Sequence, residues 1–196
     1  MLRPRAVAAS STISVLGCTA PVYPVPAGAG QTEPVHRWLV AGALIEGEGG
    51  LLLVRNRRRG GHEDWSTPGG VIDAGETVLE GLGREVREET GLVVTAWEGP
   101  VYEIRAEAPD LGWSLRVEVH RALAYEGQVV VEDPDGIVVD ARFVATDDCP
   151  ALLAGGHRWV GEPLGEWLGG DRGPGRSYEY LVKGRDLRGL EVERRA

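Results

Sequence analysis

The hydrophobic and polar positions of this chain change their pattern at His36. Residues 1 to 34 show no sustained periodicity and are broken by prolines and glycines, which predicts a flexible N-terminal leader. From Trp38 to Glu46 the run WLVAGALIE predicts a buried strand, and LLLVRNR, from Leu51 to Arg57, predicts a second. Because the turn Glu48-Gly49-Gly50 separates them, the two strands are expected to form a hairpin.

The rest of the chain mixes strand-like and helix-like segments. Strands are predicted for LVVTAW, VYEIRAE, WSLRVEVHRALAYE, IVVDARFV and YEYLVKGRDL, where apolar positions alternate or β-branched residues cluster. Short helices are predicted near residues 147–153 and 158–168, and a turn is predicted from Trp65 to Gly70. Strands outnumber helices and the order is mixed, so the prediction is one α+β domain, residues 35 to 192, after the leader.

One longer helix is predicted between Thr77 and Gly91. Thr77 is expected to be its N-cap, because Glu80 stands three residues later and completes a capping box. The helix should continue to about Thr90, with Gly91 as the residue that ends it. At helical spacing, Val78, Leu82 and Val86 fall on one side with Leu79 close by, which predicts the buried stripe.

Three glutamates, Glu85, Glu88 and Glu89, share one face at the edge of that stripe and are expected to line a crevice. At a dielectric of ~20 and a separation of ~5.5 Å, each like-charged pair costs roughly 3 kcal/mol before screening. Clustered carboxylates suit Mg²⁺ or Mn²⁺, and the alternative interpretation is a solvated acidic face. Gly81 and Gly83 count against that alternative, since each costs about 1 kcal/mol relative to Ala in a helix interior.

The composition limits the classes of function. The 196 residues carry a formal charge of -9, which argues against a non-specific nucleic-acid binder, and nucleic acid is not expected as a partner. No apolar run approaches the roughly 20 residues needed to span a bilayer. Two cysteines are too few for a disulfide framework, so a cytoplasmic location is predicted. The alternative is a lipidated, exported form through Cys18, because Val15-Leu16-Gly17-Cys18 resembles a lipoprotein cleavage box.

The segment from Gly70 to Leu92 resembles the Nudix box. Its fixed positions are occupied by Gly70, Glu76, Arg84-Glu85-Val86, Glu88-Glu89 and Gly91-Leu92. The resemblance implies a Nudix fold, in which a mixed β-sheet is sandwiched between helices and the box forms a loop–helix–loop catalytic motif. It also implies a Mg²⁺-dependent or Mn²⁺-dependent hydrolase that cleaves a diphosphate linkage in a nucleoside diphosphate linked to another group.

The same resemblance implies a role for each residue of the motif. The metal ligands would be Glu85, Glu88 and Glu89, the catalytic residues Glu88, Glu89 and Arg84, the substrate-binding residues Gly69 and Gly70, and the structural supports Glu76 and Gly91. The expected partner is a small-molecule nucleoside diphosphate derivative, and a homodimer is compatible with the sequence. The alternative function is a non-catalytic Nudix-fold module that senses nucleotides, against which the intact glutamate set argues.

Two parts of the site are left open by the sequence. Arginines of the predicted hairpin could bind substrate phosphates through bidentate contacts; this is predicted for Arg55, whereas a solvated loop is favoured for Arg57, Arg58 and Arg59. A further acid outside the box is the other open part. Asp135 or Asp140 could supply it, although Ile137 stands about where a glutamate is often expected and a plain turn is an equal alternative.

Overall fold

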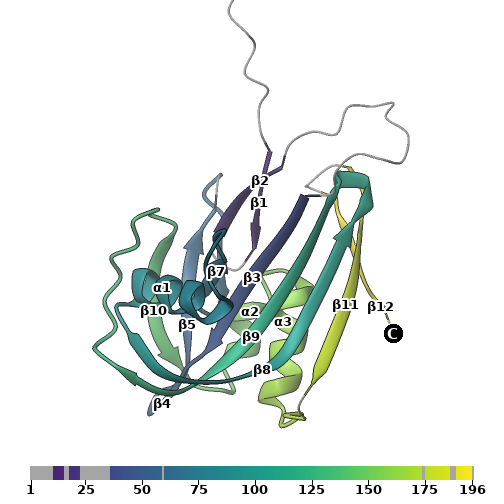
Figure 1. Cartoon of the computed structure of the whole chain (residues 1–196). Helices are drawn as coiled ribbons and strands as arrows, with labels where there is room; N and C mark the ends of the chain where they lie inside the picture. The colour runs from purple at the N-terminus through teal and green to yellow at the C-terminus, as the bar shows by residue number, and fades with distance from the viewer. Residues whose placement is uncertain are drawn as a thin grey trace, which may run out of the picture.

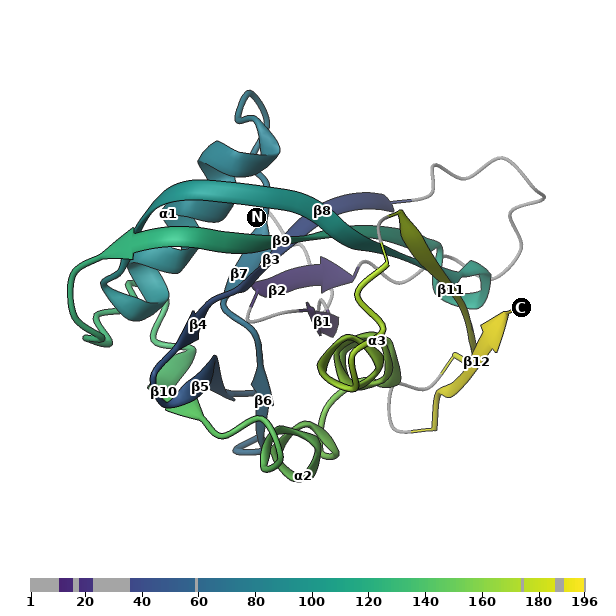
Figure 2. The same cartoon turned by 90° about the horizontal axis from the view of Figure 1, so that it is seen from below.

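The computed structural model describes residues 11–15, 18–22, 36–58, 60–173, 175–185 and 189–195. Two β-sheets lie between helix α1 (Val78–Thr90) on one side and helices α2 (Cys149–Leu153) and α3 (Arg158–Leu168) on the other (Figures 1 and 2). The predicted α+β fold with a mixed sheet between helices is therefore confirmed.

The larger sheet has six strands in the order β12-β11-β8-β9-β3-β7. Their bounds are β12 Glu191–Arg195, β11 Arg176–Lys183, β8 Val93–Ala108, β9 Trp113–Glu126, β3 His36–Leu44 and β7 Gly69–Val71. β11 runs parallel to β8 and β3 runs parallel to β9, while the other neighbours are antiparallel, so the sheet is mixed. A short 3₁₀ turn, Pro109–Leu111, joins β8 to β9.

The smaller sheet is built around β5 (Gly50–Arg57). β5 pairs antiparallel with β10 (Val138–Val144), with the two-residue β4 (Glu46–Gly47) and with β6 (Glu63–Ser66). The remaining strands, β1 (Ser11–Val15) and β2 (Cys18–Val22), form an antiparallel hairpin within the predicted leader. The rest of residues 1 to 34 lies outside the described residues, so the flexibility of the leader stays a prediction.

The core is divided by the sheets into two halves, because successive side chains of a strand point to opposite faces. On one face of β3, Ala41 and Ala43 pack with Leu82 and Val86 of α1. On the other face, Val40 and Leu44 pack in a larger cluster that includes residues of α2 and α3. Leu79 was predicted to lie near the buried stripe of α1, but 41% of it is exposed, so that expectation was wrong.

The predicted turn from Trp65 to Gly70 was also largely wrong. Residues Glu63–Ser66 form β6, which pairs with β5, and Gly69–Val71 form β7, which pairs with β3. β6 has four residues and returns from β5 in a hairpin, and β7 has three residues and pairs with the earlier strand β3, so neither strand is long enough to show a period of its own. β12 was missed for a similar reason, since its sequence EVERR is almost entirely charged.

The two glycines inside α1 differ in what surrounds them. A Cβ added at Gly81 would lie 2.8 Å from both Ile72 Cδ1 and Glu76 Oε2, whereas a Cβ added at Gly83 would meet nothing within 4 Å. We therefore expect Gly83→Ala to raise the free energy of unfolding by about 1 kcal/mol through helix propensity alone. Gly81→Ala should lose that gain to steric conflict. Urea denaturation of both variants measures this, and equal stabilisation would contradict the close packing at Gly81.

Candidate active site

Helix α1 is fixed at both ends by its own sequence. Thr77 Oγ1 accepts a hydrogen bond from the Glu80 backbone N–H at 3.3 Å, and Glu80 Oε2 accepts one from the Thr77 N–H at 2.9 Å. At the other end Gly91 adopts a left-handed conformation with φ 73°, and its N–H donates to the Arg87 carbonyl. The predicted capping box and helix end are confirmed, and they set which face of α1 carries the glutamates.

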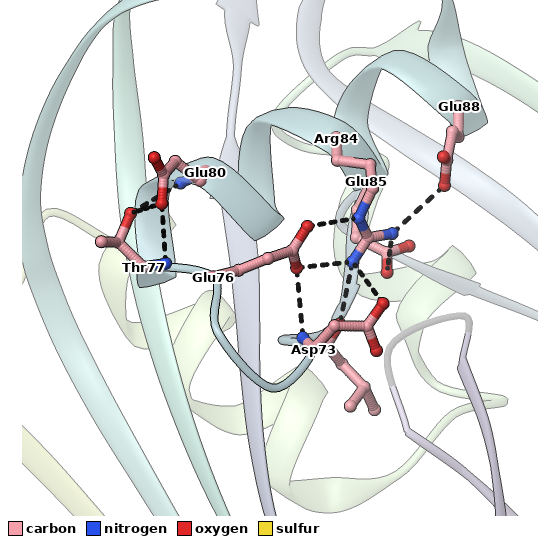
Figure 3. A network of polar contacts seen from close by, with 8 residues as sticks. Asp73, Glu76, Thr77, Glu80, Arg84, Glu85 and Glu88 are labelled. Atoms are coloured by element: carbon pink, nitrogen blue, oxygen red, sulfur yellow. Dashed lines mark hydrogen bonds and ion pairs between the residues drawn. The ribbon is translucent and has the colours of Figure 1, made fainter.

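Arg84 is the centre of the polar contacts around this helix (Figure 3). Its guanidinium donates two hydrogen bonds to Glu76, at 2.9 and 3.0 Å. It also donates to Glu85 at 2.8 Å and to Glu88 at 3.3 Å. The hydrogen bonds from Arg84 hold the pKa of the Glu76 carboxyl below its ordinary value. One arginine therefore ties the loop before α1 to two of the three predicted metal ligands.

The glutamates face a small cavity of about 40 Å³, which we call the acidic cavity. This volume exceeds the roughly 10–15 Å³ that one water molecule requires, so the cavity has room for a small ion or water. The crevice predicted from the sequence is thus confirmed. The residues that line it are Arg84, Glu85, Glu88, Glu89, Asp133, Asp135 and Ile137.

Of the three glutamates that line the acidic cavity, Glu89 and Glu85 are the most removed from solvent. Only 4% of Glu89 is exposed, and burial raises the pKa of its carboxyl well above the ordinary value. A hydrogen bond from the Gly69 N–H, at 2.9 Å, opposes that shift in part. Burial likewise raises the pKa of Glu85, against the lowering effect of Arg84. A cation in the acidic cavity would favour the ionised form of both carboxyls.

The pair Gly69-Gly70 lets strand β7 pass close beneath the helix. A Cβ at Gly70 would lie 2.5 Å from the Glu85 carboxylate, so the carboxylate would have to move from its present position. Gly69 has φ 143°, and a Cβ there would lie 2.1 Å from the Ala41 carbonyl oxygen. The bare backbone of these two glycines lies against the glutamates, and the Gly69 N–H donates to Glu89.

The loop before β10 supplies the acids outside the box. Asp135 lines the acidic cavity, whereas Asp140 lies on β10 with its carboxylate 3.9 Å from Arg55. Asp133, which sequence reasoning did not single out, also lines the cavity, and its carboxylate accepts hydrogen bonds from the N–H groups of Ile137 and Val138, both at 2.7 Å. The Asp-Pro-Asp-Gly turn was the signal that could have identified it, since an aspartate at the start of such a turn commonly bonds the backbone ahead.

The donor set of the acidic cavity fits a hard divalent cation. Among the residues that the structure describes, no three acidic, histidine or cysteine side chains stand together as a ready-made metal cage. Arg84 instead donates to Glu85 and Glu88. Mg²⁺ retains several waters and needs only one or two carboxylates from the protein, so carboxylate oxygens around a small cavity meet its requirements.

A model of the NUDIX domain family matches residues 36–167 of the chain. The chain belongs to the Nudix hydrolase family. The matched range contains α1, the acidic cavity and the loop before β10, so the resemblance seen in the sequence is confirmed.

Individual Nudix relatives cover different parts of the chain. A MutT-like protein of Streptomyces ambofaciens is 43% identical over 63 residues, which is 32% of this chain and 39% of that protein. A putative 8-oxo-dGTP diphosphatase 2 of Mycobacterium tuberculosis is 31% identical over 123 residues, 57% of this chain and 87% of that protein. The solved structure of a Nudix hydrolase from Nitrosomonas europaea is 26% identical, covers 70% of this chain and 93% of that chain, and superposes with a TM-score of 0.53.

Outside the Nudix box, the structure separates Arg55 from the acidic cavity. Arg55 lies two residues after Leu53 on β5, so both side chains are on the same face of the strand. Leu53 packs in the cluster shared with α2 and α3. The Arg55 guanidinium lies 3.3 Å from Glu63 and 5.9 Å from the centre of the Trp65 ring. A substrate-binding role for Arg55 therefore stays a prediction without a contact to the glutamates.

The predicted hairpin of residues 38–46 with 51–57 is limited to the pairing of β4 with β5, because β3 pairs with β9 and β7. The arginines that follow Arg55 have acidic partners of their own. Arg57 pairs with Glu63 at 3.3 Å, and Arg58 pairs with Asp64 at 2.7 Å in a largely buried contact. Arg59 lies outside the described residues. No helix in the described part of the chain is both long and apolar enough to cross a bilayer.

The raised pKa of Glu89 predicts how the metal-free protein responds to pH. Because its folded pKa lies above the ordinary value of 4.5, the folded state holds the proton more tightly, and stability falls as pH rises through that folded pKa. Glu89→Gln removes this loss. In EDTA, we expect the variant to gain stability over the native chain as pH rises above about 4.5, with the gap constant at higher pH.

Urea denaturation between pH 4 and 8 measures that gap. Glu193→Gln is the control of opposite sign, because hydrogen bonding to Lys183 lowers the pKa of Glu193, and its contribution is lost as pH falls. A gap between native chain and Glu89→Gln that did not change with pH would contradict the buried placement of Glu89.

Proposed function

We propose that this chain is a metal-dependent hydrolase that cleaves the diphosphate linkage of a nucleoside diphosphate joined to another group. The observation that carries the proposal is that Glu85, Glu88 and Glu89 line one small cavity. Their crowding destabilises the metal-free protein, and a divalent cation relieves it. Membership of the Nudix family supports the same reaction class.

Mg²⁺ or Mn²⁺ is the proposed cofactor, held by Glu85, Glu88 and Glu89. When bound, the cation supplies charge to neutralise phosphate oxygens and to lower the pKa of a water molecule. Gly69 and Gly70 are buried, and the bare Gly70 backbone leaves room for the Glu85 carboxylate, so the two glycines lie beside the place where the diphosphate would bind. Gly69 and Gly70 are therefore proposed to contact substrate.

Glu88 and Glu89 are proposed as the catalytic carboxylates. Glu88 would accept a proton from water, and Glu89 would help to hold the cation. The Glu88 side chain is 39% exposed, so it faces incoming substrate and water, and we assign it the acceptance of the water's proton. Glu89 is held by the Gly69 N–H and is too buried to meet bulk water. Asp135 borders the same cavity and is the second candidate for the proton acceptor.

Arg84 is proposed as a positioning residue rather than one that reacts. Its guanidinium donates to Glu76, Glu85 and Glu88 and so orients the carboxylates before metal arrives. Glu76 anchors the arginine to the loop, and Gly91 ends the helix that carries the cluster. These supports keep the glutamates in one geometry, which is the condition for efficient proton transfer.

A cytoplasmic location is proposed with this function. Nucleoside diphosphate derivatives are intracellular metabolites, and Cys149 is a buried free thiol, as expected in a reducing compartment. The small-molecule derivative is the proposed partner, and the net acidic charge disfavours nucleic acid.

Metal binding should be visible as stabilisation of the native state. A ligand present at 100 times its Kd, and bound only by the folded chain, adds about 2.7 kcal/mol to the free energy of unfolding. We expect Mg²⁺ or Mn²⁺ to raise the Tm measured in EDTA, and Glu85→Gln to reduce that increase. Glu193→Gln on the distant strand β12 should keep it. Identical melting curves in EDTA and in millimolar Mg²⁺ would argue against a metal site.

Turnover should depend on Glu88 more than stability does. Glu88→Gln keeps size and helix propensity while removing one charge from the cluster, so the metal-free Tm should stay the same or rise. On the best substrate from a screen of nucleoside diphosphate derivatives, kcat should fall roughly 10² or more with a smaller change in KM. Full activity in both Glu88→Gln and Glu89→Gln would sink the catalytic assignment. Nucleotide binding without turnover would instead favour the sensing module.

A further inference from the structure

A second, larger cavity adjoins the acidic one. It lies between α1 and the first residues of β8, has a volume of about 520 Å³, and is called here the α1–β8 groove. Arg84 and Glu88 line both cavities, so the two share a wall. Its volume falls within the roughly 300–1,000 Å³ typical of small-molecule sites. The residues that line it are Leu79, Glu80, Gly83, Arg84, Arg87, Glu88, Val93, Val94 and Trp97.

The groove gathers apolar side chains that the fold leaves uncovered. Among the described residues four large hydrophobic side chains are exposed, and two of them, Leu79 at 41% and Val93 at 48%, lie here. Trp97 is half-buried at the same place and packs against the core on the α1 side of the sheet. Arg87 adds a cation at the rim. An apolar lining with a few charged groups suits a flat aromatic ligand that carries phosphate.

Gly83 has no packing role of its own. A Cβ at Gly81 would lie 2.8 Å from side-chain atoms of Ile72 and Glu76, which would have to shift, but a Cβ at Gly83 would meet nothing within 4 Å. A glycine inside a helix disfavours the helix relative to alanine, so it needs a reason. Gly83 lines the groove, where any side chain would stand in the open volume. Keeping the groove open supplies that reason.

We propose that the α1–β8 groove binds the nucleobase of the substrate whose diphosphate lies at the acidic cavity. This inference rests on the proposed function, which it deepens by naming how the nucleoside end is held. The base contacts Trp97, Leu79 and Val93, and Arg87 donates hydrogen bonds to it or to the adjoining ribose. Arg84 and Glu88 line both cavities and would lie between the nucleobase and the diphosphate of one ligand.

The test fills the groove without disturbing the metal cluster. Gly83→Leu places a side chain in the open volume, and leucine favours the helix over glycine, so the variant should fold. Gly165→Leu is the matched control, since Gly165 lies inside α3, on the opposite side of the sheets, and a Cβ there also meets nothing within 4 Å (Figure 2). Leu79→Ala is a second variant that removes an exposed contact.

Calorimetric titration in Mg²⁺ uses three probes: ADP, GDP and inorganic pyrophosphate. We expect Gly83→Leu to weaken binding of at least one nucleotide about tenfold while pyrophosphate binding stays within twofold of the native chain. Leu79→Ala should weaken the same nucleotide a few-fold, and Gly165→Leu should change nothing. In turnover, Gly83→Leu should raise KM about tenfold with kcat nearly unchanged.

Four outcomes would overturn the proposal. The first is that Gly83→Leu binds nucleotide as tightly as the native chain, and the second is that it weakens nucleotide and pyrophosphate binding equally. The third is that the native chain binds neither ADP nor GDP. The fourth is that sedimentation shows a native dimer that Gly83→Leu dissociates. Failure of the proposed function gives a different result. If the native chain hydrolyses none of the substrates but Gly83→Leu selectively weakens nucleotide binding, the groove assignment stands and the proposed function fails. Normal hydrolysis with an unchanged KM in Gly83→Leu rejects the groove alone.

Discussion

The contact between Arg84 and Glu76 is the interaction on which the candidate site depends. Glu76 stands in the loop before α1 and Arg84 two turns into the helix, and two hydrogen bonds of 2.9 and 3.0 Å join them. The same guanidinium reaches Glu85 and Glu88, so one positive charge lies among several negative ones. Without it, mutual repulsion would push the carboxylates apart toward solvent. Arg84 thus acts in the metal-free protein as a partial substitute for the missing positive charge.

Space near the backbone is the second constraint, and it is linked to the first. Gly70 leaves room for the Glu85 carboxylate, and Gly81 leaves room for Glu76 and Ile72. Each glycine therefore makes way for a side chain that Arg84 holds or that packs beside it. At Gly81 the groups that approach the helix are the carboxylate of Glu76, from the loop before α1, and the side chain of Ile72.

Local signals in the sequence were sufficient for α1, and they were insufficient for the connections around it. The capping box and the end at Gly91 involve residues within one turn of each other, so their chemistry is legible in the sequence. β9 was predicted from Trp113 to Glu126 because its alternation is long. β6 and β7 have only four and three residues, too few to show a period, and β7 also depends on its partner β3. Similarly, the sequence alone does not show whether Asp135 or Asp140 lies near the glutamates. The pairing of β10 with β5 decides this, because it places Asp140 opposite Arg55.

Adjacent faces of helix α1 line the two cavities, and this has a thermodynamic consequence. Arg84 and Glu88 border both the acidic cavity and the α1–β8 groove, so a change in their positions on one side alters the other. A cation that drew Glu88 inward would loosen its contact with Arg84 and would change the charge at the groove wall. Linkage then requires the reverse effect, in which a ligand in the groove changes the affinity for the cation by the same factor. Under the two proposals, the helix that holds the glutamates would be the physical route by which recognition of one end of a substrate and activation of the other become coupled.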